Sequence, residues 1–281
     1  MKVLITGGNG GLGQALTAPL TAAGHTYISV DVDSIDITAP RAVRTCFAEH
    51  TPDLVIHCAA LTNVDLCAQQ PDEAIRVNGY GTQNVAVACA KAGIPMCYIS
   101  TNEVFDGERG TPYLEYDVPH PANPYGYSKY VGECVVREVL PAHFIVRTSW
   151  LFAHTGRNFL QRIVALAREG KPLTVVTDEV ASPTYVPDLA AAIVQLVETG
   201  QYGTFHLVNE GYTSRFNFAK AILEGYGLAN HPLSPITRAQ FPRPSRPPAY
   251  GALRNVMAAL VGVRLRTWQE ALRAFIAHEN L

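Results

Sequence analysis

The segment Tyr125–Lys129 (YGYSK) places a phenol and an amine four residues apart. On a helix these two positions share a face, and an adjacent ammonium favours the phenolate form of tyrosine. The spacing therefore predicts that the pKa of Tyr125 lies below its reference value of about 10, so that the phenol exchanges a proton near neutral pH. Tyr127 is the competing tyrosine, but it lies two residues from Lys129 and off its helical face.

The pair Ser100-Thr101 ends an apolar run that predicts a buried strand over residues 96–100. Parallel sheets bind their ligands at the carboxyl ends of their strands. We therefore expect the Thr101 hydroxyl to bond a substrate carbonyl oxygen together with Tyr125. This makes Thr101, Tyr125 and Lys129 the predicted catalytic residues.

Gly7, Gly10 and Gly13 form the pattern G-x-x-G-x-x-G between a predicted strand over residues 2–6 and a predicted helix. Glycine lets the backbone turn tightly against a pyrophosphate, and the start of a helix offers free N–H groups. The pattern therefore predicts a dinucleotide-binding loop.

Asp31 ends the second predicted strand, near the offset of roughly 20 residues at which an acid bonds the adenosine ribose hydroxyls. An acid there repels a 2′-phosphate, so Asp31 slightly favours NAD(H) over NADP(H), and Asp33 competes for the same role.

A nicotinamide cofactor, a tyrosine acid and a lysine together predict hydride transfer to a carbonyl. Tyr125 would protonate the carbonyl oxygen, and Lys129 would hold the nicotinamide ribose.

Short apolar runs alternate with helical patterns through the first half of the chain, which predicts an α/β fold with a Rossmann-like, doubly wound parallel sheet. Strands are expected over residues 2–6, 27–30, 53–57, 96–100 and 143–148, and helices over 12–23, 40–50, 72–92 and 125–140. The second half is less regular, with helices over 158–169, 187–199, 216–226 and 267–278, strands over 173–176 and 203–207, and a proline-rich loop over 241–248. We expect a dinucleotide-binding domain, residues 1–149 plus about 174–207, and a smaller α/β substrate-binding domain near the C-terminus, about 150–173 plus 208–281.

The composition of the 281 residues, 48% hydrophobic and 16% charged, excludes a disordered or coiled-coil chain. The formal net charge is −2 and no basic run stands out, so we expect no nucleic-acid partner and no membrane partner. The N-terminal apolar run, Val3 to Ile5, is too short for a signal peptide, which predicts a cytoplasmic protein. Scattered histidines and cysteines without CxxC predict reduced thiols and no metal site, and a homodimer is the common state of soluble oligomers.

The chain resembles the extended short-chain dehydrogenases/reductases over nearly its whole length. The segments TGGNGGLG, HCAALTNVDLCAQQPDEAIRVN, ISTNEVFDG and NPYGYSKYVGE carry this resemblance. Within that superfamily RTSWLF, GRNF, SPTYVPDLA, FHLVNEG and RPPAYGALRN are most similar to the dTDP-4-dehydrorhamnose reductases. The resemblance implies an NAD(P)H-dependent oxidoreductase of dTDP-rhamnose biosynthesis. Its substrate would be a nucleotide sugar, dTDP-6-deoxy-L-lyxo-4-hexulose, whose C4 ketone is reduced to give dTDP-L-rhamnose.

The resemblance also implies roles for individual residues. The expected cofactor-binding residues are Gly7, Gly10, Gly11, Leu12, Gly13, Asp31, Asp36, Ile37, Cys58, Ala59, Ala60, Thr62, Asn78, Ser100, Tyr125 and Lys129. The expected substrate-binding residues are Thr101, Asn102, Glu103, Tyr125, Trp150 and Arg246. Trp150 would pack on the sugar or its nucleotide, and the Arg246 guanidinium would match the phosphates.

One segment departs from the reductase pattern, which commonly shows Thr-Asp-Tyr where this chain has Thr101-Asn102-Glu103. Asn102 has no titratable proton and cannot act as a general acid. We interpret Glu103 as a group that contacts the substrate or supports one that does. The departure leaves a deoxysugar other than rhamnose open.

Two further readings remain open on the sequence. A sugar-nucleotide epimerase would keep NAD tightly bound and recycle it. A non-catalytic regulatory subunit would bind NADP and a partner enzyme, but it has no need of the set Thr101, Tyr125 and Lys129.

Overall fold

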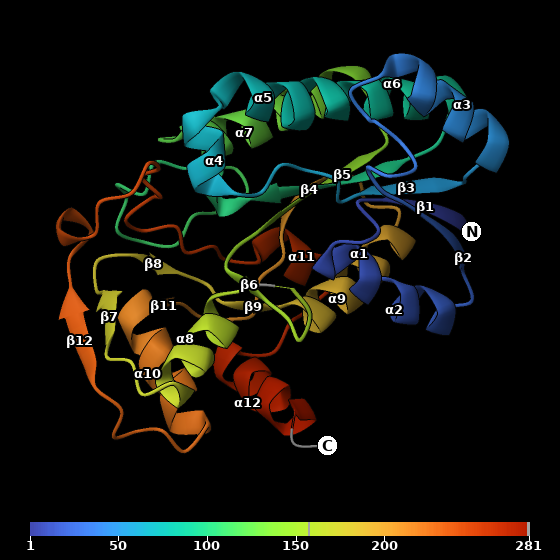
Figure 1. The fold of residues 1–281 in the computed structure, drawn as a ribbon. Helices are drawn as coiled ribbons and strands as arrows, with labels where there is room; N and C mark the ends of the chain where they lie inside the picture. Colours follow the sequence, from blue (N-terminus) through green and yellow to red (C-terminus); the bar gives the residue numbers. More distant parts are fainter. Residues whose placement is uncertain (157, 280–281) are drawn as a thin grey trace.

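The computed structural model of the protein describes residues 1–156 and 158–279. Its centre is a six-stranded sheet in the order β10-β5-β4-β3-β1-β2, in which every pair of neighbours runs parallel (Figure 1). The six strands are β1 (Lys2–Thr6), β2 (Thr26–Val30), β3 (Leu54–His57), β4 (Met96–Thr101), β5 (His143–Thr148) and β10 (Gly203–His206). The strand order reverses between β1 and β3, and this reversal creates the crevice in which such sheets bind ligands.

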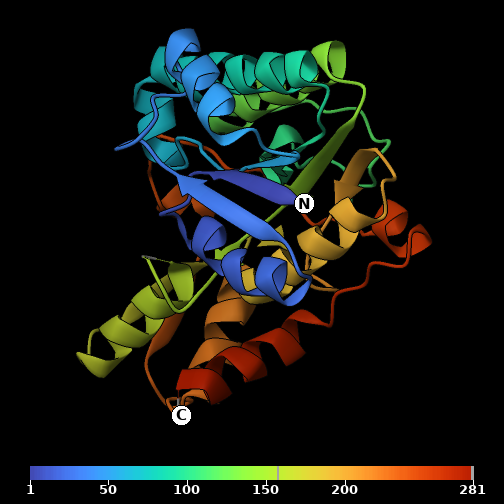
Figure 2. The same cartoon turned by 90° about the vertical axis from the view of Figure 1, so that its right-hand side faces the viewer.

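Helices cover both faces of this sheet, as Figure 2 shows most clearly. One layer consists of α3 (Pro40–His50), α4 (Val64–Gln69), α5 (Pro71–Ile75), α6 (Thr82–Ala92) and α7 (Pro124–Val139), and the other of α1 (Gly11–Ala15), α2 (Thr17–Ala22), α9 (Val186–Glu198) and α11 (Val256–Leu260). Along β1, Val3 and Ile5 join the hydrophobic core under α9, whereas Leu4 joins the core under α3 and α6. This alternation confirms the doubly wound α/β fold.

Two long expected helices are interrupted in the structure. The helix expected over residues 72–92 consists of α5, a π-helical turn Arg76–Gly81 and α6. The helix expected over residues 12–23 is divided between α1 and α2. A hydrophobic pattern does not distinguish these breaks from a continuous helix, because Leu16, Ile75 and Thr82 at the breaks keep right-handed helical backbone angles.

The remaining elements form a smaller α/β part below the sheet (Figure 1). It contains three strand pairs, β6 (Leu151–Phe152) with β9 (Thr184–Tyr185), β7 (Leu173–Val176) with β12 (Leu233–Ile236), and β8 (Val180–Ala181) with β11 (Thr213–Ser214). Its helices are α8 (Phe159–Arg168), α10 (Arg215–Gly225) and α12 (Trp268–Glu279). Phe152, Phe218, Trp268 and Phe275 share its separate hydrophobic core.

The strand pairing bears on the boundary expected near residue 174. β7 pairs with β12 rather than with the central sheet, so we propose that residues 173–181 belong to the smaller part. Ala258 and Val263 pack into the core under α9, so we also propose that the α11 region returns to the dinucleotide-binding part. Within the described residues, no helix has the length and apolar character needed to cross a membrane.

Candidate active site

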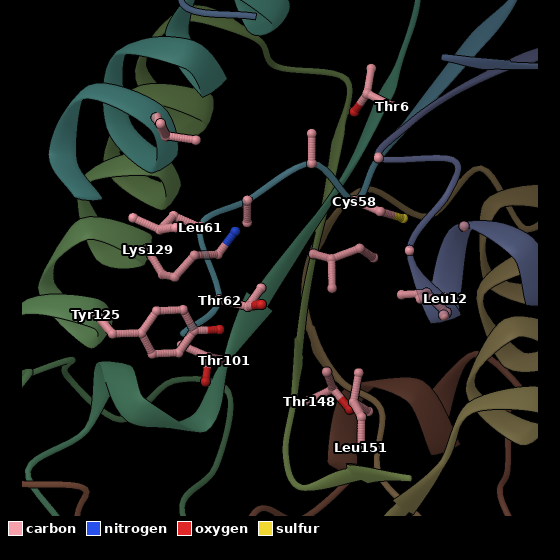
Figure 3. Close-up of a pocket in the computed structure, with 18 of the residues that line it drawn as sticks. Thr6, Leu12, Cys58, Leu61, Thr62, Thr101, Tyr125, Lys129, Thr148 and Leu151 are labelled. Carbon is pink, nitrogen blue, oxygen red and sulfur yellow. The ribbon is translucent and has the colours of Figure 1, made fainter. Parts of the chain in front are cut away.

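A cavity of about 1170 Å³ opens at the carboxyl ends of the central strands. Its wall includes the glycine loop at one end and Thr101, Tyr125 and Lys129 at the other, and Figure 3 shows the last three side chains projecting into it. Every expected cofactor-binding residue except Asn78 lines this cavity, as does every expected substrate-binding residue except Arg246. The structure thus brings together residues that lie more than 100 positions apart in the chain.

The glycine loop after β1 requires glycine at two positions, because a side chain at either would clash with nearby backbone atoms. Gly7 has φ of +71°, and a Cβ atom there would lie 2.6 Å from the backbone nitrogen of Ala59. A Cβ atom at Gly13 would clash with the carbonyl oxygen of Gly7. The bare backbone left by these glycines fits the close approach of a dinucleotide pyrophosphate.

Asp31 lies at the cavity wall and also braces the glycine loop. Its Oδ2 accepts a 2.7 Å hydrogen bond from the Asn9 N–H, and its Oδ1 accepts one of 2.7 Å from the Val32 N–H. The competing acid, Asp33, is exposed and does not belong to the described wall. The position of Asp31 therefore agrees with the expected ribose contact better than that of Asp33.

The start of α7 sets the position of Tyr125. Asn123 caps the helix, because its Oδ1 accepts a 2.8 Å hydrogen bond from the Gly126 N–H, and Pro124 occupies the first helical position. Tyr125 and Lys129 then follow one turn apart on the face toward the cavity (Figure 3). Thr101, the last residue of β4, lies beside the Tyr125 ring.

The electrostatics of this pair differ from the expectation. Burial raises the pKa of Tyr125, the negative charge of Glu103 raises it further, and the Thr101 hydroxyl acts in the opposite direction. Burial also lowers the pKa of Lys129 to about 7, and its Nζ lies 4.2 Å from the centroid of the Tyr98 ring. The expected lowering of the Tyr125 pKa is therefore wrong, because removal from water and the charge of Glu103 outweigh the opposing effect of the Thr101 hydroxyl.

Comparison with known proteins gives the family. The whole chain, residues 1–281, matches the model of the RmlD substrate binding domain family. The chain belongs to this family. A dTDP-4-dehydrorhamnose reductase of Mycolicibacterium smegmatis is 37% identical over 280 residues, which cover 98% of this chain and 85% of that protein.

Two solved structures are also similar to this RmlD family member. A dTDP-4-dehydrorhamnose reductase from Clostridium acetobutylicum matches with a TM-score of 0.96 and 39% identity, over 100% of both chains. The enzyme of the same name from Bacillus anthracis, in complex with NADP, matches with a TM-score of 0.94 and 38% identity, over 99% of both chains.

Asn78 and Arg246 stand apart from the cavity wall in this RmlD family member. The Asn78 side chain accepts a 2.8 Å hydrogen bond from the Leu61 N–H and donates one of 3.0 Å to the Leu61 carbonyl. It also donates a 2.9 Å hydrogen bond to Ser128 on α7, so it holds the loop after β3 against that helix. Arg246 is exposed, and its carbonyl oxygen accepts a 3.3 Å hydrogen bond from Asn123 Nδ2.

Arg215 lines the cavity, although no sequence motif indicated it as a site residue. Its guanidinium carbon lies 3.6 Å from the centroid of the Trp150 ring, and its Nε lies 3.7 Å from Glu179 Oε2. Burial lowers the pKa of Arg215 to about 10, although Glu179 favours the charged form. No motif surrounds Arg215 at the start of α10, so only the fold reveals that it stacks on Trp150.

Proposed function

We propose that the protein reduces the C4 ketone of a dTDP-4-keto-6-deoxy sugar with NAD(P)H, and specifically converts dTDP-4-dehydrorhamnose to dTDP-L-rhamnose. The observation that carries this proposal is the convergence of Thr101, Tyr125 and Lys129 in the cavity that also contains the glycine loop. The names of the similar RmlD family members support the same substrate.

The cavity residues fit a dinucleotide, because Gly7 and Gly13 let the loop after β1 turn tightly at one end of the cavity, and Gly10 and Gly11 line that end without side chains. When bound, the reduced nicotinamide would supply the hydride. Asp31 would bond the adenosine ribose, and Lys129 would bond the ribose next to the nicotinamide.

Tyr125 acts as the general acid in this proposal. Its raised pKa keeps the phenol protonated at neutral pH, which is the form that reduction of a ketone requires. Tyr125 and Thr101 both donate hydrogen bonds to the ketone oxygen, where negative charge develops, and the tyrosine then transfers its proton. Lys129 favours the phenolate that this transfer leaves behind.

The second end of the cavity would hold the sugar nucleotide. Trp150 lines this end, and Arg215 fixes the Trp150 ring by stacking on it. We propose that Trp150 packs on the substrate and that Arg215, rather than Arg246, is the guanidinium nearest to it.

We propose NADH as the slightly favoured cofactor. Residues 30–35 contain two acids and no lysine or arginine, so the end of β2 offers no cation for a 2′-phosphate. The Bacillus anthracis relative was solved with NADP, and comparing kcat/KM for NADH and NADPH on this chain tests the proposed preference.

The deciding experiment measures oxidation of NADH and NADPH by the purified protein with dTDP-4-keto-6-deoxyglucose. The assay is run with and without a separate 3,5-epimerase, and the product is identified by NMR. Formation of dTDP-L-rhamnose when the epimerase is present supports the proposal. A pure protein that binds the cofactor but oxidises none with either sugar would overturn it.

A further inference from the structure

Glu103 is an ionisable group in the cavity that hydride transfer leaves unused. It follows Thr101 by two residues, in the 3-10 turn Asn102–Val104. The Glu103 N–H donates a 3.2 Å hydrogen bond to Thr101 Oγ1, and both side chains line the cavity. The turn therefore holds the Glu103 backbone against the hydroxyl that would bond the ketone oxygen, and Glu103 lines the same cavity as that hydroxyl.

One amide holds Glu103 against the helix that carries Tyr125. Asn123 Nδ2 donates a 2.7 Å hydrogen bond to Glu103 Oε2, while Asn123 Oδ1 caps α7 at Gly126. The two segments touch, because a Cβ atom at Gly126 would clash with the Glu103 carbonyl oxygen. Glu103 Oε1 receives no hydrogen bond from the residues that the structure describes, so this oxygen is free to take up a proton from a ligand.

The surroundings of Glu103 bring the pKa of its carboxyl close to neutral pH. Burial raises the pKa of Glu103 to about 7, and Asn123, Arg215 and Arg243 act against this rise while Glu179 adds to it. At neutral pH both forms of the carboxyl are therefore populated, which suits a group that takes up and returns a proton. A cavity that shifts the pKa values of several groups in different directions is typical of acid–base chemistry.

The proposed substrate has a proton that such a base can remove. Hydrogen atoms on the carbons beside a ketone are acidic, because the electron pair left behind is delocalised onto the carbonyl oxygen. Hydrogen bonds from Thr101 and Tyr125 would stabilise the negative charge on that oxygen. A base, two hydrogen-bond donors to the ketone oxygen and the ketone itself are the parts needed for proton abstraction next to a carbonyl.

We propose that Glu103 removes and returns a proton on a carbon beside the C4 ketone, so that the protein also enolises its keto-sugar substrate. This proposal rests on the proposed function. The C–H bond breaks, its electron pair passes into the enolate, and the proton moves to Glu103 Oε1; the reverse transfer restores the ketone. No oxidant or reductant is consumed. While the carbon is planar, the proton held by Glu103 exchanges with water, so the restored C–H bond contains hydrogen from the solvent before hydride transfer fixes the product.

The test follows deuterium uptake rather than reduction. The protein is incubated in D2O with dTDP-4-keto-6-deoxyglucose and oxidised NAD, so that no hydride is available, and deuterium at C3 and C5 is measured by NMR and mass spectrometry. The wild-type protein should exceed the rate without protein, and Glu103→Gln should lower the protein-dependent rate by about 10²–10⁴-fold. Glu103→Asp, which keeps a shorter carboxylate, should give an intermediate rate.

Two controls make the outcome decisive. Glu108→Gln changes an exposed carboxylate in the same segment and should exchange deuterium like the wild type. Binding of NAD, measured by fluorescence, shows that each variant is folded. Wild-type exchange no faster than without protein, or Glu103→Gln exchange equal to wild type, would overturn the proposal. A separate assay of NADH oxidation on the epimerised sugar distinguishes this failure from failure of the proposed reductase.

Discussion

The Arg147 guanidinium donates two hydrogen bonds to the Glu133 carboxylate, from Nε to Oε1 at 2.8 Å and from Nη2 to Oε2 at 2.7 Å. The side chains are 1% and 0% exposed. Ser100 Oγ donates a further 2.6 Å hydrogen bond to Glu133 Oε1. Glu133 lies one turn after Lys129 on α7, so this buried ion pair holds the helix of the proposed acid against the ends of β4 and β5.

Arg147→Met should destabilise the protein by about 3–5 kcal/mol, because it leaves the Glu133 carboxylate buried without its main partner. Urea unfolding at pH 7 measures this change in the free energy of unfolding. Arg137→Met is the matched control, since Arg137 binds the same carboxylate at 2.8 Å but its side chain is 35% exposed. The control should lose less than about 1 kcal/mol. Equal losses in the two variants would contradict the role given to Arg147.

Tyr125→Phe should lower the turnover of the 4-keto sugar by about 10²–10⁴-fold, because the ring keeps its shape but loses the proton that it donates. Cofactor affinity should change little. Tyr127→Phe is the matched control, since Tyr127 is 50% exposed and lies outside the described cavity wall. Steady-state kinetics and cofactor titration measure both effects. Turnover close to wild type in Tyr125→Phe would remove the tyrosine from the mechanism.

These residues differ in how well the sequence alone predicts them. The glycine loop and the pair Tyr125 and Lys129 depend on spacing within one turn or one helix, so local rules place them. Arg215 on Trp150 and Arg147 on Glu133 are contacts between distant segments, and no local pattern encodes them. Most of the fold follows from alternating strands and helices, whereas the short strand pairs such as β6 with β9 contain too few residues to show a period.

The charge of buried groups is likewise set by the fold. Lys129 and Tyr125 have the expected spacing, but the structure buries both, and burial shifts their pKa values away from the charged forms. Asn78 falls within the expected set, yet it acts on Leu61 rather than at the wall. Sequence patterns therefore identify members of the site more reliably than they identify the pKa or the contacts of each member.

His206→Gln should make the protein less sensitive to acid. His206 is fully buried, and burial together with the charge of Arg147 lowers its pKa to about 3 from 6.5. The unfolded chain therefore binds more protons than the folded chain between these values, so stability falls as the pH falls from 6.5 toward 3, by up to about 1.4 kcal/mol per pH unit. Urea unfolding of both proteins between pH 7.5 and about 5 measures the free energy of unfolding. As the pH falls, this free energy should decrease more in the wild type than in His206→Gln. If the free energy of unfolding depends on pH in the same way in both proteins, His206 is not the source of the acid sensitivity.

Asp31→Ser should shift the cofactor preference toward NADPH, because it removes the charge that would repel a 2′-phosphate. The variant also loses the hydrogen bonds of Asp31 to Asn9 and Val32, which loosens the glycine loop for both cofactors. The informative quantity is therefore the ratio of kcat/KM for NADH to kcat/KM for NADPH, which should fall by about tenfold, or about 1.4 kcal/mol. Asp33→Asn is the matched control, because Asp33 is exposed and outside the described wall, and it should leave the ratio unchanged. A ratio that moves in Asp33→Asn and not in Asp31→Ser would reassign the ribose contact to Asp33.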